Sequence, residues 1–374
     1  MIRFIHTADL QLGMPFAWLP GDSGAQLRNW RFDAIDRVVD LAATQDASFI
    51  VVAGDLFDAN TVDDRTVEQA CSRFGRARVP VFAIPGNHDH GGPGSIWQRD
   101  RFKRSRPENF HVLDSRDPVR VGHAVLLPAP LNQRFEAGDT TSHWTPSFGA
   151  EAGPSSVRIG LAHGGVSGFG EAEGHNLIDP ARAERADLDY LALGDWHGCR
   201  EAGKRAWYAG TPEPTGFKDN NPGHVLVVTA GRGVPPRVEP VPVAHARWVR
   251  HSETLHNGDD IERLHRWFAE LDAPLSSLVR LELAGSLCFS DMERLDDLLG
   301  QMEGRLIHLR RRGEGLIPEG KAEELDSIAS GGFVADAVEN LRAEVEMGGV
   351  QGALAARSLQ LLYRLHRAAA RAAA

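Results

Sequence analysis

The chain has 374 residues, a formal net charge of −10 and 42% hydrophobic residues. That length predicts two domains, or one large domain with an appendage, and the composition is ordinary for a globular protein. The acidic balance argues against a protein that coats nucleic acid by its own charge, because Lys and Arg drive phosphate binding. Bound metal cations or a basic partner can supply positive charge, so the balance is compatible with a nuclease.

Targeting signals are not visible in the sequence. No apolar run reaches the length of a membrane span, and the chain starts at once on a strand-like run, so we expect neither a membrane segment nor a signal peptide. The three cysteines, Cys71, Cys199 and Cys288, are widely spaced and form no metal or redox motif. A reducing, cytoplasmic location fits this pattern.

From residue 1 to about 245, strand-like runs alternate with helical patterns. Apolar spacing predicts a helix between the first two strands, through Leu27, Trp30, Ile35, Val38, Val39 and Leu41, and another after the second strand, through Val62, Val67, Ala70 and Phe74. This β-α-β order favours parallel strands. After Asn109 we expect three short strands in a meander, at 112–113, 119–121 and 124–127, and later two more, at 224–229 and 238–243.

A second α/β unit is predicted to begin near residue 246. Its expected order is a strand at 246–251, a helix at 259–271, a strand at 278–284, a helix at 291–302 and a strand at 305–309. From residue 321 the pattern is helical, with a break at Gly348-Gly349. The predicted parts are therefore residues 1–245, a capping domain at 246–315, and C-terminal helices at 321–374.

Polar residues follow five strand-like runs, at 2–5, 49–52, 81–84, 157–161 and 190–193. The carboxyl ends of neighbouring strands lie at one rim of a sheet, so residues far apart in the sequence can share a site there. The five blocks at these ends are Asp9-Leu10-Gln11, Gly54-Asp55, Gly86-Asn87-His88-Asp89, His163-Gly164 and Gly194-Asp195-Trp196-His197. Taken singly, an Asp or Asn after a strand is more often a loop or capping residue. The ordered set instead indicates one metal site.

The residue types in these blocks suit two divalent ions. Such a pair can clamp both oxygens of an in-line phosphoryl displacement, and it needs a carboxylate that bridges the ions. We assign Asp55 as the bridge. The other ligands are assigned as Asp9, Gln11 and His197 for one ion, and Asn87, His163 and Asp195 for the other. Positions two apart, such as 9 and 11, point to one face where the chain is extended.

His88 directly follows Asn87 and is the candidate catalytic residue. A histidine at that place can protonate the leaving oxygen or stabilise negative charge on the phosphoryl group. Asp89 would fix the tautomer of His88, as carboxylates near a metal site do.

The ordered blocks resemble the calcineurin-like metallophosphoesterase superfamily and, within it, the SbcD/Mre-type DNA repair nucleases. The likeness to the nucleases is carried by the segments 6–13, 54–58, 190–197 and 208–214. It covers roughly residues 1–245. In the rest of the chain only the order of parts, a small capping domain and then helices, is similar to the family.

The resemblance implies a four-layer αββα sandwich with a small α/β capping domain and C-terminal helices. It implies metal-dependent hydrolysis of DNA, by an exonuclease or endonuclease acting in repair. It also implies a homodimer, and binding of the C-terminal helices to an SMC-like ATPase such as SbcC. The final helical segment carries Arg357, Arg364, Arg367 and Arg371 without an acid. From the residues alone it is equally a docking helix or a helix packed on its own protein.

Two positions depart from the family pattern. Gln11 and Asp195 stand where members usually carry His, one on each ion by our assignment. Both replacements keep an oxygen donor, and oxygen ligands favour Mn²⁺ or Mg²⁺ over Zn²⁺, so we expect Mn²⁺ first and Mg²⁺ as the other candidate. Asp58 stands where some members have a second catalytic histidine. These changes predict a dinuclear site of altered affinity.

Two other functions remain open on the sequence. The first is a phosphodiesterase of small molecules or cyclic nucleotides, or a phosphomonoesterase, although such enzymes usually need neither a capping domain nor extra helices. The second is a scaffold with weakened metal binding that regulates an ATPase partner. Gln11 and Asp195 are its only support.

Overall fold

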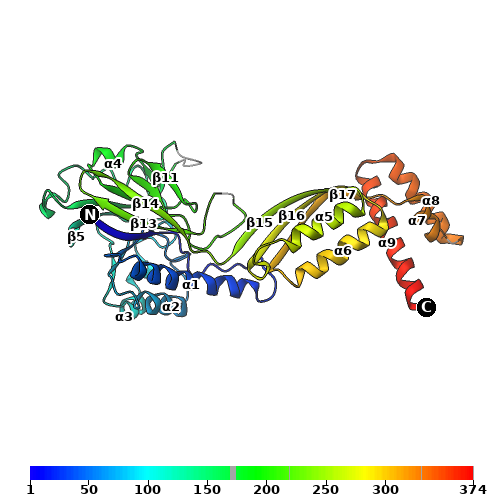
Figure 1. Cartoon of the computed structure of the whole chain (residues 1–374), viewed down its shortest axis with the longest axis horizontal. Helices are drawn as coiled ribbons and strands as arrows, with labels where there is room; N and C mark the ends of the chain where they lie inside the picture. The colour runs from blue at the N-terminus through cyan, green and yellow to red at the C-terminus, as the bar shows by residue number, and fades with distance from the viewer. Residues whose placement is uncertain (169–173, 219, 330, 374) are drawn as a thin grey trace. The chain divides into compact units, whose positions relative to one another are not determined.

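A computed structural model describes residues 1–168, 174–218, 220–329 and 331–373 (Figure 1). The chain divides into two compact units, Met1–Ala246 and Arg247–Ala374, and each is described by itself. Among the helices that the structure describes, none is long and apolar enough to cross a membrane.

The first sheet of the first unit has six strands in the order β14-β13-β1-β2-β3-β4. Their bounds are β1 Ile2–Thr7, β2 Ile50–Val52, β3 Val81–Ala83, β4 Phe110–Val112, β13 His224–Gly231 and β14 Val234–Pro242. Strands β1 to β4 are parallel, and β13 lies antiparallel beside β1. All of β2 and β3 is buried, because helices cover one face of this sheet and the second sheet covers the other.

Two helices form the outer layer on this sheet, where the apolar spacing predicted them. α1 (Ser23–Thr44) buries Ile35 and Val38 against the sheet, and α2 (Asp64–Phe74) buries Val67 and Phe74. α2 begins after Asp63, whose carboxylate accepts a hydrogen bond from Thr66 N at 2.7 Å. Shorter elements follow, η1 Ile96–Gln98 and α3 Asp100–Ser105.

The second sheet has the order β11-β12-β10-β7-β6-β5. Its strands are β5 Val119–Val121, β6 Ala124–Ala129, β7 Val157–His163, β10 Tyr190–Gly194, β11 Arg200–Gly203 and β12 Ala206–Tyr208. The meander expected after Asn109 is wrong. β4 completes the first sheet in parallel with β3, and only β5 and β6 form an antiparallel hairpin. Short apolar runs carry no signal for the sheet that they join.

The two sheets pack face to face and confirm the sandwich. Phe4 of the first sheet meets Tyr190 of the second edge to face, with ring centroids 5.5 Å apart. The outer face of the second sheet is covered by Trp144, by α4 (Arg182–Arg185) and by loops. Smaller elements here are η2 Ala150–Ala152 and the two-residue strands β8 Gly165–Val166 and β9 Leu177–Ile178. Because β1, β2 and β3 are parallel, as are β6, β7, β10 and β12, several strands end together at one rim of each sheet.

The second unit contains the β-α-β-α-β order that its sequence predicted. Its elements are β15 Arg247–Leu255, α5 Gly258–Ala269, η3 Pro274–Ser276, β16 Ser277–Leu287, α6 Phe289–Glu303 and β17 His308–Pro318. The three strands are parallel in the order β15-β16-β17. An Asn257 capping box begins α5, whose Ile261 and Phe268 pack with Leu295 of α6.

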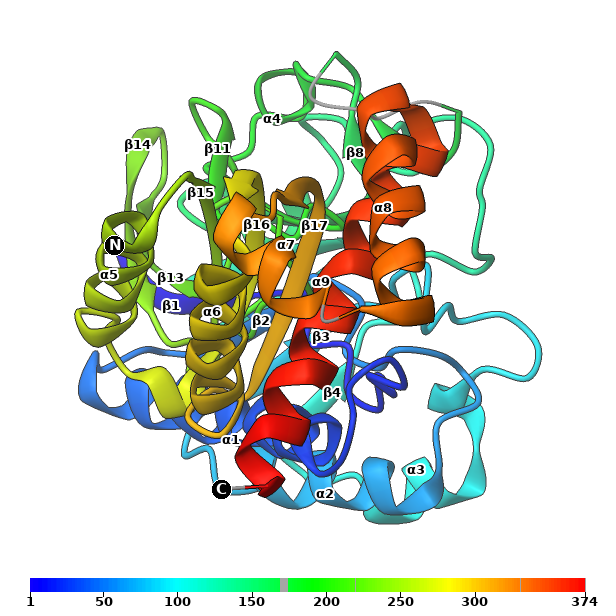
Figure 2. The same cartoon turned by 90° about the vertical axis from the view of Figure 1, so that its right-hand side faces the viewer.

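Three helices follow the small sheet: α7 Ala322–Ile328, α8 Gly332–Met347 and α9 Gly349–Ala373. The break expected at Gly348-Gly349 is confirmed, since Gly348 adopts a φ of 71° that ends α8. Figure 2 shows α8 beside α9, and α9 running along β17 and α6. The roles assigned to the capping region and to these helices stay predictions.

Candidate metal centre

The polar blocks lie on tight turns at the carboxyl ends of the strands. Four of their residues, Asp9, Gln11, Asp55 and Asp195, have φ values of 53°, 44°, 53° and 95°. The extended conformation assumed for positions 9 and 11 is therefore wrong. A left-handed conformation costs about 1–3 kcal/mol at a residue other than glycine, and such strain persists where surrounding contacts over-determine it. Here the turns are held by hydrogen bonds from Asp9 N to Gly54 O (3.1 Å) and from Gln11 N to Asp55 O (2.9 Å).

His163 is fully buried at the end of β7, and its ring is fixed by the neighbouring sheet. Nδ1 donates to the carbonyl oxygen of Ala53 at 2.8 Å. Nε2 consequently faces the acids, 3.5 Å from Asp55 Oδ1 and 3.8 Å from Asp195 Oδ1. A backbone carbonyl on one ring nitrogen is the usual way to aim the other nitrogen at a metal.

Asn87 completes this group of acceptors. Its Oδ1 lies 2.9 Å from His163 Nε2 and 3.0–3.2 Å from the two carboxylate oxygens of Asp55. Oxygen against oxygen at these distances is unfavourable. A cation among these atoms, or the amide turned round so that its nitrogen donates, relieves it.

Gln11 and His197 form a second pair in the centre. Gln11 Nε2 donates to His197 Nε2 at 3.1 Å, and His197 Nδ1 lies 3.2 Å from Thr215 Oγ1. Burial, and then the charge of Arg31, lowers the pKa of His197 to about 4, so the ring is neutral at pH 7. Gln11 Oε1 is buried without a hydrogen-bond partner among the described residues. An oxygen in that state is a natural ligand for a cation.

The charges at the centre also favour cations. Asp9 is fully buried, and burial raises its pKa well above the usual range. Asp55 and Asp195 add to this rise and His163 opposes it. The donor atoms of Asp9, Asp55 and His163 lie within 4.8 Å of one another. Clustered carboxylates with imidazole and amide oxygens are a donor set that fits divalent ions such as Mn²⁺ or Mg²⁺.

Two glycines of the blocks are required by close packing against these ligands. A Cβ at Gly54, where φ is 90°, would lie 2.2 Å from His163 Nδ1. A Cβ at Gly86 would lie 2.2 Å from Asp55 Oδ1. The glycines therefore leave the space in which the ligand side chains stand.

The structure brings all eight predicted site residues to one rim of the sandwich. The group that orients His88, however, is not the one expected. His88 N donates to Asp55 Oδ1 at 2.9 Å, and Nδ1 lies 2.7 Å from the carbonyl oxygen of Asp58. Asp89, expected to fix the tautomer of His88, instead accepts from Gly86 N (2.7 Å) and Phe57 N (3.1 Å). Asp89 points into the core, so it shapes the turn, and a backbone carbonyl orients the histidine.

Several residues near the centre carried no signal in the sequence. Thr215 orients His197 through its hydroxyl group. It directly follows the 208–214 segment but was not part of it. Arg31 is buried beneath the centre and donates to Leu10 O at 2.8 Å. The carbonyls of Ala53 and Asp58 cannot be identified from residue type, because every residue has one.

The loop around Phe135 joins two of the ligand-bearing turns. Gly91 N, in the turn after His88, donates to Leu131 O at 2.8 Å. On the other side, Glu136 N donates to the side chain of Asn176 at 2.7 Å, and Asn176 O accepts from Gly165 N, two residues after His163. The loop that carries Phe135 is therefore anchored to the turns that follow His88 and His163.

Phe135 is 58% exposed on this loop. Its ring centroid lies 5.3 Å from the ring centroid of His175. The guanidinium group of Arg134 lies 5.6 Å from the centroid of the Phe135 ring. Arg134 is close enough to act by its charge on Asp58, whose carbonyl orients His88. An exposed aromatic ring with an arginine beside it is suited to stack on a flat ring.

Comparison with known proteins identifies the family. The sequence profile described as calcineurin-like phosphoesterase matches residues 2–199. The chain is 29% identical over 212 residues to the uncharacterized metallophosphoesterase YhaO of Bacillus subtilis (strain 168), over 52% of this chain and 48% of that protein. It is 33% identical over 95 residues to the DNA double-strand break repair protein Mre11 of Archaeoglobus fulgidus, over 24% of this chain and 19% of that protein. The chain thus spans about half or less of the length of these relatives.

Solved structures are similar at lower identity. TT1561 of Thermus thermophilus is 15% identical with a TM-score of 0.39, over 65% of this chain and 99% of that one. Purple acid phosphatase PPD1 from yellow lupin (Lupinus luteus) seeds is 14% identical with a TM-score of 0.40, over 65% of this chain and 51% of that one. The profile match covers more than half of the chain and every block of the centre. The chain belongs to the calcineurin-like phosphoesterase family, whose hydrolases depend on two metal ions.

Proposed function

We propose that the chain hydrolyses phosphodiester bonds of DNA with two divalent ions, Mn²⁺ before Mg²⁺, as an exonuclease or endonuclease of the SbcD/Mre type. The observation that carries the chemistry is the converging donor set around Asp55 and His163. The partial match to an archaeal break-repair protein supports the DNA branch. Phe135 supports it independently, because an exposed aromatic ring on a loop anchored to the ligand-bearing turns would serve a substrate with bases.

The ions, when bound, would lower the pKa of the attacking water and neutralise charge on the phosphoryl oxygens. The other steps fall to the chain. Asp9, Asp55 and His163 would hold the cations, and the buried backbone of the turns keeps these side chains in place. His88, anchored through Nδ1 on Asp58 O, has Nε2 as the nitrogen left to donate a proton to the leaving oxygen.

The test is Mn²⁺-dependent cleavage of labelled single- and double-stranded DNA, run beside p-nitrophenyl phosphodiester and monoester substrates. Asp55→Ala and His88→Ala should each abolish or strongly reduce cleavage. His123→Ala, at an exposed turn, is the matched control. DNA cleavage that survives Asp55→Ala, or hydrolysis of the small esters alone, would contradict the nuclease assignment.

A regulatory scaffold is the second candidate, because Gln11 directs its amide N–H at the nitrogen by which His197 would bind metal. Gln11→His with Asp195→His restores the usual family ligands. A sharp rise in Mn²⁺-dependent activity in this double variant would support the scaffold. Activity no higher than that of the parent would mean that the native ligands are already competent.

We further propose that the C-terminal helices bind an SMC-like ATPase of the SbcC kind. Large apolar side chains stand exposed on α8 and α9: Phe333, Met347, Val350, Leu354, Leu361 and Leu365. Such a surface suits a partner helix. Val350→Asp with Leu354→Asp should abolish co-elution with the ATPase and leave the circular dichroism spectrum unchanged, and co-elution that persists would contradict this docking. The homodimer also stays a prediction, which sedimentation of the chain can test.

A further inference from the structure

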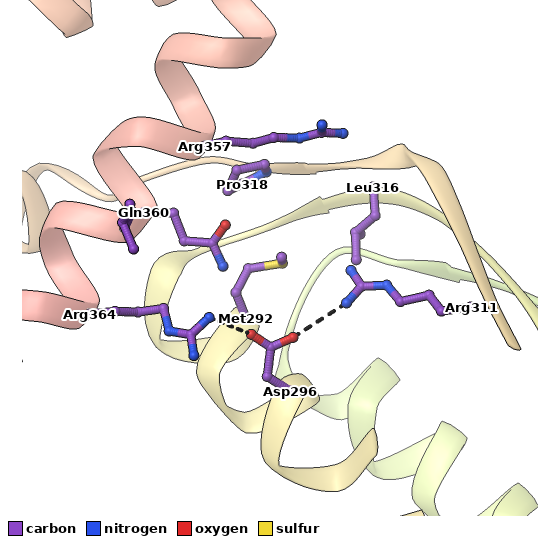
Figure 3. Close-up of a pocket in the computed structure, with 9 residues that line it drawn as sticks. Met292, Asp296, Arg311, Leu316, Pro318, Arg357, Gln360 and Arg364 are labelled. Carbon is purple, nitrogen blue, oxygen red and sulfur yellow. Dashed lines mark hydrogen bonds and ion pairs between the residues drawn. The ribbon is translucent and has the colours of Figure 1, made fainter. Parts of the chain in front are cut away.

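A cavity rich in arginine lies within the second unit, between α6, β17 and α9 (Figure 3). Its volume is about 550 Å³, which falls in the range of sites for small molecules. Arg311 reaches it from β17, and Arg357 and Arg364 reach it from α9. All three elements belong to the second unit, and none of the described residues that line the cavity belongs to the metal centre.

The charges of this cavity are not balanced by its own residues. Asp296 is the one acid among the described residues that line it, and two arginines share that carboxylate. Arg311 Nη1 lies 3.3 Å from Asp296 Oδ1, and Arg364 Nη1 lies 3.2 Å from Oδ2 (Figure 3). Arg357 forms no hydrogen bond or ion pair with the described residues. Three guanidinium groups against one carboxylate leave two positive charges in excess, in a chain whose net charge is −10.

The excess charge selects the kind of anion. Guanidinium groups bind phosphate and carboxylate through paired N–H donors. A carboxylate would balance only one of the two charges, whereas a phosphomonoester carries roughly −1.5 to −2 at pH 7 and balances both. The arrangement therefore favours a terminal phosphate group.

Apart from the amide of Gln360, the remaining wall of the cavity is apolar. Met292 of α6, together with Leu316 and Pro318 of β17, lines the side between the arginines. A sugar phosphate has no apolar group to place there, but a nucleobase has a flat and largely apolar face. We propose that this cavity binds a nucleoside monophosphate unit, with its phosphate on Arg357 and Arg364 and its base on the Met292–Leu316 wall.

A nucleoside monophosphate occurs as a free nucleotide and at the 5′-phosphorylated end of a DNA strand, so the experiment compares both. Binding is measured on the full chain in the presence of a chelator, which keeps the metal centre from contributing. The probes are inorganic phosphate, deoxyadenosine 5′-monophosphate, and a short oligonucleotide with or without a 5′-phosphate. Arg357→Gln is the main variant. The Arg357 guanidinium forms no hydrogen bond or ion pair with the described residues, so its removal should not destabilise the second unit. Arg364→Gln is the second.

Arg367→Gln is the matched control. Arg367 lies on the same helix, but its guanidinium stands 5.9 Å from the Tyr363 ring and does not line the cavity. We expect the nucleotide to bind the parent and Arg367→Gln alike, and Arg357→Gln at least ten times more weakly. Preference for the 5′-phosphorylated oligonucleotide over the unphosphorylated one would identify a DNA end as the source, and binding of the free nucleotide alone would identify a small effector.

Three results would overturn the proposal: no binding of any phosphate probe, equal binding by Arg357→Gln and the parent, or inorganic phosphate binding as tightly as the nucleotide. None of these depends on DNA cleavage. The cavity and the nuclease function can therefore fail separately.

Discussion

His163 Nδ1 donates to the carbonyl oxygen of Ala53 at 2.8 Å, and this one contact sets the direction of the whole ring. Nε2 is left facing Asp55, Asp195 and Asn87. The imidazole can hold a proton there or a metal ion, but not both. The proton and the metal therefore compete for the same nitrogen.

This competition predicts how metal affinity depends on pH. Burial lowers the pKa of His163, but the carboxylates of Asp55, Asp9 and Asp195 outweigh it and raise the pKa to about 9. Below that value the metal-free ring is protonated, so binding must release the proton. Apparent Mn²⁺ affinity should rise about tenfold per pH unit between pH 7 and 8.5. Calorimetry in buffers of different ionisation enthalpy measures the release, and affinity that stays flat over this range would contradict the mechanism.

Gly54→Ala should damage both stability and the metal centre. The new methyl would lie 2.2 Å from His163 Nδ1, at a φ of 90°. Gly94→Ala is the control, since its φ is 80° and, apart from its chain neighbours, no atom of the described residues lies within 4 Å of its Cβ position. The control should lose about 1–3 kcal/mol of unfolding free energy from backbone strain alone, and Gly54→Ala should lose more and bind less Mn²⁺. Equal denaturation midpoints and equal metal content in the two variants would refute the packing argument.

His88→Ala should slow chemistry without removing metal. Loss of a general acid costs roughly 10²–10⁴-fold in rate, and His88 contributes only its backbone N–H to Asp55. A p-nitrophenolate leaving group needs no proton, so its diester should lose much less activity than DNA does. Comparing kcat on the two substrates, with metal content measured, tests the role. An equal loss on both would assign His88 to charge stabilisation instead.

Phe135→Ala should weaken DNA cleavage because a DNA base loses the ring on which it stacks. Stacking of one base on an aromatic side chain contributes about 1–3 kcal/mol, so kcat/KM on DNA should fall by roughly 5- to 150-fold, while Phe135→Trp retains activity. DNA with a single abasic position scanned along it supplies the matched test. The parent should lose activity when the abasic position meets Phe135, and Phe135→Ala should lose no more there. Additive losses at every position would exclude stacking.

Much of the fold was readable from the sequence because strand and helix patterns are local. The runs at 2–5, 49–52 and 157–161 are strands β1, β2 and β7, and the apolar stripe from Leu27 to Val39 is the buried face of α1. The partner of each strand is not a local property. That is why β4, predicted as part of a meander, joins the first sheet instead.

The sequence by itself determined which residue types stand at the ends of the strands, and so the family and the donor set that could hold metal ions. Only the tertiary structure decided how they are aimed. The left-handed turns at Asp9, Asp55 and Asp195, the carbonyls behind His163 and His88, and the contact of Gln11 with His197 depend on atoms from different strands. The cavity between α6, β17 and α9 likewise depends on side chains from different elements. A hydrogen bond across 110 residues, such as that from His163 to Ala53, exists only once the sheets have packed.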